Sequence, residues 1–178
     1  MSGIAAGTFD GVGTTVGFKN ARGLVVAPNG VLLVADTGGQ KIRSVLQSGI
    51  VSTVAGNGST SITQDGYGTN ALFSNPYGIA MDSSNNAYVA DYSSHRVRMI
   101  SPLGLVTTLA GGGVIGPPVS VSGSGDAQGT NAGFLWPTGV TVSQITGVII
   151  TYVVDYGNHK IRSSELNAEN TPTSGVQY

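Results

Sequence analysis

Short apolar runs separated by turn residues recur along the chain. In the first stretch four runs follow one another: GLVVAP (23–28), VLLVAD (31–36), KIRSVL (41–46) and GIVSTVAG (49–56). Runs of this length, bounded by Gly, Pro and Asn, predict β-strands. The second run is apolar at its first five positions, so both faces of that strand must be covered. The pattern predicts a unit of four short antiparallel strands.

The same unit returns twice. Each copy has an aspartate at the end of its second run, and these aspartates lie 55 and 64 residues apart. An earlier marker, D-x-x-G-T, opens each copy and is followed eight residues after its aspartate by a phenylalanine. The markers are Asp10, Asp65 and Asp126, then Phe18, Phe73 and Phe134, then Asp36, Asp91 and Asp155. We expect the three units at about residues 10–56, 65–111 and 126–165, within one segment covering 1–178.

Four-stranded antiparallel units that stack face to face are typical of β-propeller blades. The predicted fold class is therefore all-β, with three four-stranded antiparallel blades that form an incomplete propeller arc. Propellers typically have 4 to 8 blades, so two flat apolar faces are left open and need a cover. The cover could be further blades of a longer chain, a second copy, or a stack of copies that forms a fibre.

Two segments carry a family resemblance. NPYGIAMDSSNNAYVADYSSHRVRMI (75–100) and GNHKIR (157–162) resemble NHL repeats, a propeller family, and the resemblance extends in three copies over about residues 10–162. The first copy departs from the pattern, with NARG in place of NPYG and Gln40 in place of the histidine. The resemblance implies the propeller fold, and it does not imply an activity.

The two ends of the sequence differ from the repeat. SGIAAGT (2–8) is similar to the fourth run of each unit, whereas residues 163–178 lose the pattern. We expect residues 1–9 to form an outer strand that completes a blade of a neighbouring chain by strand addition. Residues 163–178 are expected to be a tail or a degenerate strand.

Composition narrows the function classes. The net charge is −1 with 10% charged residues, which disfavours nucleic acid as a partner. The absence of cysteine excludes disulfides and thiolate metal sites, and the longest apolar run, GVIITYVV (147–154), is too short to span a membrane. The N-terminus lacks the features of a signal peptide. The compartment stays open, with an extracellular location favoured.

Most charges occupy repeat-equivalent positions, which indicates a structural role. An Asp that ends a buried strand can accept loop N–H bonds or pair with an Arg on the returning strand. The predicted structural repeat residues are Asp36, Asp91, Asp155, Arg43, Arg98, Arg162, Phe18, Phe73 and Phe134. The charges outside the repeat are Lys19, Arg22, Asp82, Glu165 and Glu169.

Candidate chemistry is sparse, and we expect no catalytic residue, no cofactor and no metal site. His95 and His159 occupy equivalent positions in the second and third units, but the first unit has Gln40 there, which argues against metal ligands. Each D-x-x-G-T loop offers a single carboxylate, fewer oxygens than Ca²⁺ requires. The sequence contains no G-x-S-x-G motif and no phosphate-binding loop. Asn57 begins a sequon for N-glycosylation, which matters only in a secreted protein.

Three hypotheses for function follow. The first is a non-enzymatic scaffold for protein interaction or self-assembly, with homo-oligomers or fibres formed through open blade faces and an edge strand. The second is a fragment of a propeller enzyme of the lyase or lactone hydrolase type, although the inner strands supply only Asp82 to the channel. The third is recognition of RNA or protein by a propeller face, with Lys41, Arg43 and their equivalents as a basic rim. No row of aromatic residues is expected beside that rim.

Overall fold

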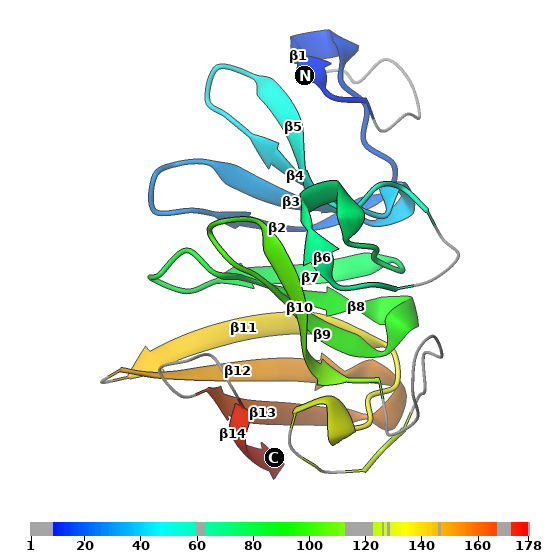
Figure 1. The fold of residues 1–178 in the computed structure, drawn as a ribbon, viewed down its shortest axis with the longest axis vertical. Helices are drawn as coiled ribbons and strands as arrows, with labels where there is room; N and C mark the ends of the chain where they lie inside the picture. The colour runs from blue at the N-terminus through cyan, green and yellow to red at the C-terminus, as the bar shows by residue number, and fades with distance from the viewer. Residues whose placement is uncertain are drawn as a thin grey trace.

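The computed structural model describes residues 9–59, 63–112, 123–125, 127, 129–145, 147–166 and 172–177. These residues form three antiparallel β-sheets, joined by loops and short 3-10 helices. The sheets lie one upon another along the long axis of the molecule in chain order, so the first and third sheets form opposite ends (Figure 1). The all-β prediction is confirmed. We call the sheets blades 1, 2 and 3.

Blade 1 is an antiparallel meander with one added strand. Its strands are β2 (Ala21–Val26), β3 (Leu32–Asp36), β4 (Lys41–Val45) and β5 (Ile50–Ala55), and β1 (Gly11–Val12) pairs outside β5. The innermost strand of the blade is β2. The two-residue strand β1 makes this a five-stranded sheet where four strands were expected.

Blade 2 repeats the same order. It consists of β7 (Pro76–Met81), β8 (Ala87–Asp91), β9 (Arg96–Ile100) and β10 (Leu105–Gly111), with β6 (Gly66–Tyr67) outside β10. Its innermost strand, β7, contacts β2 of blade 1 on one side and the inner strand of blade 3 on the other. The three inner strands therefore lie side by side.

Blade 3 is four-stranded and is completed by its own chain. Its strands are β11 (Pro137–Ile145), β12 (Val148–Asp155), β13 (Lys160–Leu166) and β14 (Pro172–Gln177). Strand β14 pairs with β13 from Leu166 opposite Pro172 to Arg162 opposite Gln177. The stretch expected to be a tail or a degenerate strand thus contains the fourth strand. Of residues 1–9, expected to complete another blade, residues 1–8 lie outside the described residues.

Six 3-10 helices of three residues each shape the loops. Three of them follow the strand-ending aspartates: η2 (Thr37–Gly39), η4 (Tyr92–Ser94) and η6 (Tyr156–Asn158). The other three lie in the loops that open each unit: η1 (Gly13–Thr15), η3 (Gly68–Asn70) and η5 (Gly129–Asn131). In the part of the chain that the structure describes, no helix is long and apolar enough to cross a membrane.

The apolar core lies between the blades, where the facing strands of neighbouring blades bury their side chains against one another. One cluster joins blades 1 and 2 and the other joins blades 2 and 3. The first comprises Leu33, Ala35, Ile42 and Ala55 against Ala71, Phe73, Ile79, Ala87, Val89, Ile100 and Val106. The second comprises Tyr88, Val97, Leu109 and Ala110 against Ala132, Phe134, Ile149, Val153 and Leu166.

Candidate functional site

Each blade contains a buried Asp–Arg pair next to its 3-10 turn. In blade 1 the Oδ1 atom of Asp36 accepts a hydrogen bond from the Lys19 N–H at 2.7 Å, and Oδ2 lies 3.2 Å from Nη1 of Arg43. Asp36 is the last residue of β3, and Arg43 lies on the neighbouring strand β4. One carboxylate therefore holds two segments: the loop before the inner strand and the returning strand.

The same arrangement recurs in the other two blades. Asp91 accepts from the Ser74 N–H at 2.7 Å and lies 3.2 Å from Nη1 of Arg98. In blade 3 the Leu135 N–H donates to Asp155 at 2.8 Å, and Nη1 of Arg162 lies 3.2 Å from the carboxylate. The structure thus brings together all six predicted charged residues as three pairs.

The arginines also bind the loops that open each unit. Nη2 of Arg43 donates to the Phe9 carbonyl oxygen at 2.7 Å and lies 2.8 Å from Asp10. Nη2 of Arg98 makes the equivalent pair with Asp65 at 2.7 Å. Asp126, the third member of this set, lies outside the described residues. These loops are more than turns, because their carboxylates bind the buried guanidinium groups.

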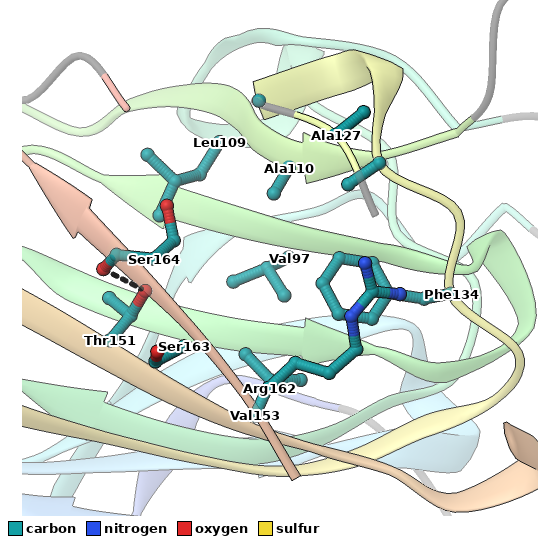
Figure 2. A pocket seen from close by; sticks show the side chains of 12 residues that line it. Val97, Leu109, Ala110, Ala127, Phe134, Thr151, Val153, Arg162, Ser163 and Ser164 are labelled. Atoms are coloured by element: carbon teal, nitrogen blue, oxygen red, sulfur yellow. Dashed lines mark hydrogen bonds between the residues drawn. The ribbon is translucent and has the colours of Figure 1, made fainter. Parts of the chain in front are cut away.

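The three predicted phenylalanines lie beside the same guanidinium groups. The Cζ atoms of Arg43 and Arg98 lie 5.3 Å from the ring centroids of Phe18 and Phe73, within the range of cation–π contacts. Figure 2 shows the third case, in which Arg162 lies beside the ring of Phe134 at 4.7 Å. The nine predicted repeat residues therefore form three copies of one structural cluster.

Burial dominates the electrostatics of these carboxyls. It raises the pKa of Asp36 and of Asp91, while the arginine charges and the loop N–H bonds offset part of the rise. Asp10 is more exposed. Burial also acts to raise its pKa, but hydrogen bonds from Thr53 and the charge of Arg43 outweigh this and lower the pKa.

The buried arginines argue against a basic rim for RNA. Arg43 and Arg98 are fully buried, and Arg162 is 5% exposed. Nucleic-acid phosphates are bound by accessible Lys and Arg side chains. Half of the six basic residues of the predicted rim are therefore committed to holding loops in place.

The predicted histidine position forms a link between blades. Nδ1 of His95 in blade 2 accepts a hydrogen bond from the Trp136 N–H at the start of blade 3, at 3.1 Å. Gln40 does the same between blades 1 and 2: its Oε1 accepts from the Asn75 N–H, and its Nε2 donates to Asn75 Oδ1 at 2.7 Å. His159, the third member, is exposed on blade 3. The substitution of Gln for His keeps the acceptor.

The other candidate ligands also have structural surroundings. Asp82 is buried and accepts hydrogen bonds from the Ser84 and Asn86 N–H groups and from the Tyr88 hydroxyl, each at 2.9 Å. Burial raises the pKa of Tyr88, and the bond to Asp82 adds to this. Among the described residues, no three His, Asp or Glu side chains group as a metal site would need. Asn57 is exposed, and its Oδ1 accepts from the Ser59 N–H at 2.8 Å.

A row of aromatic rings was missed from the sequence. The rings of Tyr77 and Tyr92 stack at 4.4 Å, Trp136 follows at 6.2 Å, and Arg22 lies over Tyr77 at 4.4 Å. This row lies beside Arg22, a charge outside the repeat and outside the predicted basic rim. The only sequence signal was Trp136, which replaces the Asn of the other units at a left-handed position with φ 54°.

The open face of blade 1 is apolar. Leu24 and Val26 on β2 are 64% and 63% exposed. Six residues of this face each correspond to a residue 55 positions later in blade 2. Blade 1 covers those six residues of blade 2. The face residues are Leu24, Val26, Leu32, Val34, Val45 and Val51, which match Ile79, Met81, Ala87, Val89, Ile100 and Val106. A hollow of about 620 Å³ lies on this face, lined in part by Val16, Phe18 and Leu32. We call it the blade 1 face.

The opposite end of the molecule carries a second open face, on blade 3. Val154 and Ile161 are 39% and 44% exposed there, whereas the matching residues of the other blades, such as Ile42 and Val97, are buried in the clusters. Tyr152, which matches the buried Tyr88, is half-buried. We call this the blade 3 face.

By contrast, the space between blades 2 and 3 is nearly filled. A cavity of about 30 Å³ remains among residues that include Val97, Phe134 and Val153 (Figure 2). Thr151, in the same wall, donates through Oγ1 to the Ser164 carbonyl oxygen at 3.2 Å. A space of this size holds one or two water molecules. The interior junction is therefore a packed contact and not a ligand site.

Comparison with known protein families gives a consistent assignment. The NHL repeat model matches residues 73–98, which lie in blade 2. Human NHL repeat-containing protein 2 is 31% identical over 165 residues, which cover 86% of this chain and 22% of the human protein. The bovine protein of the same name is 30% identical with the same coverage. The chain thus spans about a fifth of the length of these relatives.

Solved structures share the fold. An auxiliary nutrient binding protein from Bacteroides ovatus has a TM-score of 0.65 and 25% identity, over 84% of this chain and 37% of that protein. Virginiamycin B lyase from Staphylococcus aureus has a TM-score of 0.55 and 14% identity, over 89% of this chain and 40% of the enzyme. The predicted propeller arc is confirmed. The similarity to the lyase concerns the fold alone.

Proposed function

Because this chain belongs to the NHL-repeat family of β-propellers, we propose that it is a non-enzymatic scaffold that assembles with copies of itself into a larger ring or fibre. The association takes place through the two open end blades. In this proposal the residues of the repeat supply stability, and the function of the chain is to present blade faces to other blades.

The blade 1 face carries the proposal. Its six apolar residues are in the same positions as six residues of blade 2 that blade 1 covers. Full burial of an exposed Leu or Val stabilises by about 1.5–3 kcal/mol, so covering Leu24 and Val26 is favourable by roughly 1–2 kcal/mol each. A flat face of this kind on a soluble protein marks an interaction site.

The charged residues support a non-enzymatic role. Asp36, Asp91 and Asp155 are each engaged by an arginine and a loop N–H, and Asp82 is held within its own hairpin. Catalytic acids and bases need an accessible reacting site within hydrogen-bond reach. A propeller-enzyme fragment would instead require several such groups converging on the channel, and bound metal in the purified protein would favour that alternative.

Association can be tested with a charge on the blade 1 face. In Leu24→Asp the exposed position accommodates the carboxylate in the free chain, but covering the face would bury an unpaired charge. We expect the native chain to exceed its 18.0 kDa monomer mass in light scattering after size exclusion. Leu24→Asp should weaken association by at least about tenfold, equivalent to about 1.4 kcal/mol.

Leu103→Asp is the matched control, because Leu103 is 88% exposed in the hairpin between β9 and β10, away from both end faces. It should associate as the native chain does. A native chain that stays monomeric at every concentration tested would refute the proposed function.

A further inference from the structure

The two junctions inside the molecule use the same contacts at equivalent positions. At each junction a left-handed residue after the 3-10 turn accepts the N–H of a left-handed residue that precedes the next inner strand. The acceptors are Gln40 and His95, with φ of 55° and 58°. The donors are Asn75 and Trp136, with φ of 55° and 54°. The same directed hydrogen bond therefore links each blade to the next at this position.

Glycines on the inner strands let the backbones approach closely. A Cβ atom on Gly23 would lie 2.2 Å from the Tyr77 carbonyl oxygen of the next blade. A Cβ atom on Gly78 would lie 2.7 Å from the Thr138 carbonyl oxygen in the same way. Both distances are shorter than side-chain contacts allow, so each junction requires Gly at this position.

The two ends of the arc carry the unmatched halves of this junction. On blade 1, Asn20 has the donor conformation, with φ 54°, and no described residue accepts its N–H. On blade 3, His159 has the acceptor conformation, with φ 56°, and its ring has no hydrogen-bond partner among the described residues. Gly139 is equivalent to Gly78, and the atoms near its Cβ position belong only to Val154 of its own blade.

We infer that blade 3 of one copy docks on blade 1 of a second copy, head to tail, as blades 1 and 2 do within the chain. Nδ1 of His159 accepts the Asn20 N–H of the second copy, and Gly139 lies against the carbonyl oxygen of its Arg22, which is equivalent to Tyr77. Ile161 packs on the blade 1 face as Ile42 packs on blade 2. This inference rests on the proposed function and names the partner surface.

The number of blades fixes the size of the assembly. A head-to-tail contact is heterologous, so it produces either a closed ring or an open fibre. Two copies supply six blades, which is within the 4 to 8 of propellers, whereas three copies would supply more than that range. The product is therefore a closed ring of two copies. A contact of blade 1 with blade 1 would instead place two Asn20 donors together without an acceptor.

Two single variants on blade 3 test the direction of the contact. Gly139→Ala should block docking, while in the free chain its methyl group meets only the Val154 side chain, at 3.0 Å, which is exposed enough to move. Ile161→Asp disrupts the same face by a different mechanism, because it introduces a charge and not a steric overlap. Gly125→Ala is the control, because its methyl group meets no described atom within 4 Å. Circular dichroism verifies the fold of every variant.

Sedimentation equilibrium then measures the mass of each chain and of one mixture. The native chain and Gly125→Ala should form assemblies of twice 18.0 kDa. Gly139→Ala and Ile161→Asp should each be monomeric, with association at least about tenfold weaker. Equimolar Leu24→Asp and Gly139→Ala should associate more than either variant alone, because the blade 3 face of the first and the blade 1 face of the second still form one intact contact, although the ring cannot close.

The outcomes separate the two proposals. If the native chain associates and Leu24→Asp does not, while both blade 3 variants associate normally, the head-to-tail contact is wrong and the scaffold function stands. A native assembly that keeps growing beyond two copies also overturns the ring. A monomeric native chain refutes both proposals together.

Discussion

At the scale of single residues, pairing within a blade was predictable from spacing, whereas partners from distant loops were not. Asp36 and Arg43 lie seven residues apart, and the same spacing recurs in every unit, so a hairpin brings them together. Asp10 and Asp65 bind arginines 33 residues later in the chain. For these loops the sequence predicted only that one carboxylate is too few for Ca²⁺, because the sequence does not show which strand a loop folds back upon.

The buried pair in blade 2 gives the first prediction. Arg98→Met leaves the carboxylate of Asp91 buried without its cation, which should destabilise the chain by about 3–5 kcal/mol. Urea unfolding measures the loss. The double variant with Asp91→Asn should lose less than the sum of the two single losses, because the two side chains interact directly. Additive losses would show that the pair is not coupled.

His95 gives a pH-dependent prediction. Burial lowers the pKa of His95 below the usual histidine value of about 6.5, and the charge of Asp155 offsets part of this. The unfolded chain therefore binds the proton more readily, and stability that is present above about pH 7 is lost as pH falls through 6.5. Protonation of Nδ1 also removes the acceptor for the Trp136 N–H. Stability should fall between pH 7.5 and 5.5.

Gln40 indicates the control for this experiment, since it fills the same position without titrating. His95→Gln should keep the stability at pH 7.5 and lose most of the dependence between pH 7.5 and 5.5 in urea unfolding. His95→Ala should lose about 1 kcal/mol at pH 7.5, the usual contribution of one hydrogen bond. An unchanged pH dependence in His95→Gln would assign the effect to another group.

At the scale of strands, the four runs of the first unit agree with β2 to β5 within about two residues at each end. The apolar pattern was sufficient because these strands are apolar on both faces, including the face that stays open on blade 1. Strand β14 was predicted only as one of two alternatives, since its pairing with β13 is made by backbone groups that any residue except proline supplies. The two-residue strands β1 and β6 are too short to leave a periodic pattern.

Packing between inner strands gives the third prediction. Gly78→Ala places a methyl group 2.7 Å from the Thr138 carbonyl oxygen and 3.0 Å from the Gly139 Cα, so the two backbones must separate. Overpacking of this kind is expected to cost about 1–3 kcal/mol in urea unfolding. Gly139→Ala, measured on dilute monomer, should cost clearly less, because only the Val154 side chain is near. Equal losses in the free energy of unfolding would contradict the idea that contact between blades requires Gly at this position.

At the scale of the whole molecule, the open arc was predicted from the number of units, while its polarity was not. Counting three blades shows that two faces are uncovered, but the sequence does not show that one end carries donors and the other acceptors. That difference depends on left-handed residues such as Asn20 and His159, whose conformation appears only in the fold. The aromatic row across blades 2 and 3 was hidden for the same reason.

If two arcs close a ring, folding and association are linked, and the final prediction follows from that linkage. Binding of a partner at about 100 times its Kd adds about 2.7 kcal/mol to stability. For a chain of this size each kcal/mol raises Tm by about 2–4 °C. Raising the native protein from near Kd to about 100 times Kd should therefore increase Tm by about 5–10 °C in calorimetry. Leu24→Asp, whose blade 1 face cannot be covered, should keep a constant Tm over the same concentrations. A native Tm that is equally constant would contradict the linkage and show that each arc is stable without its partner.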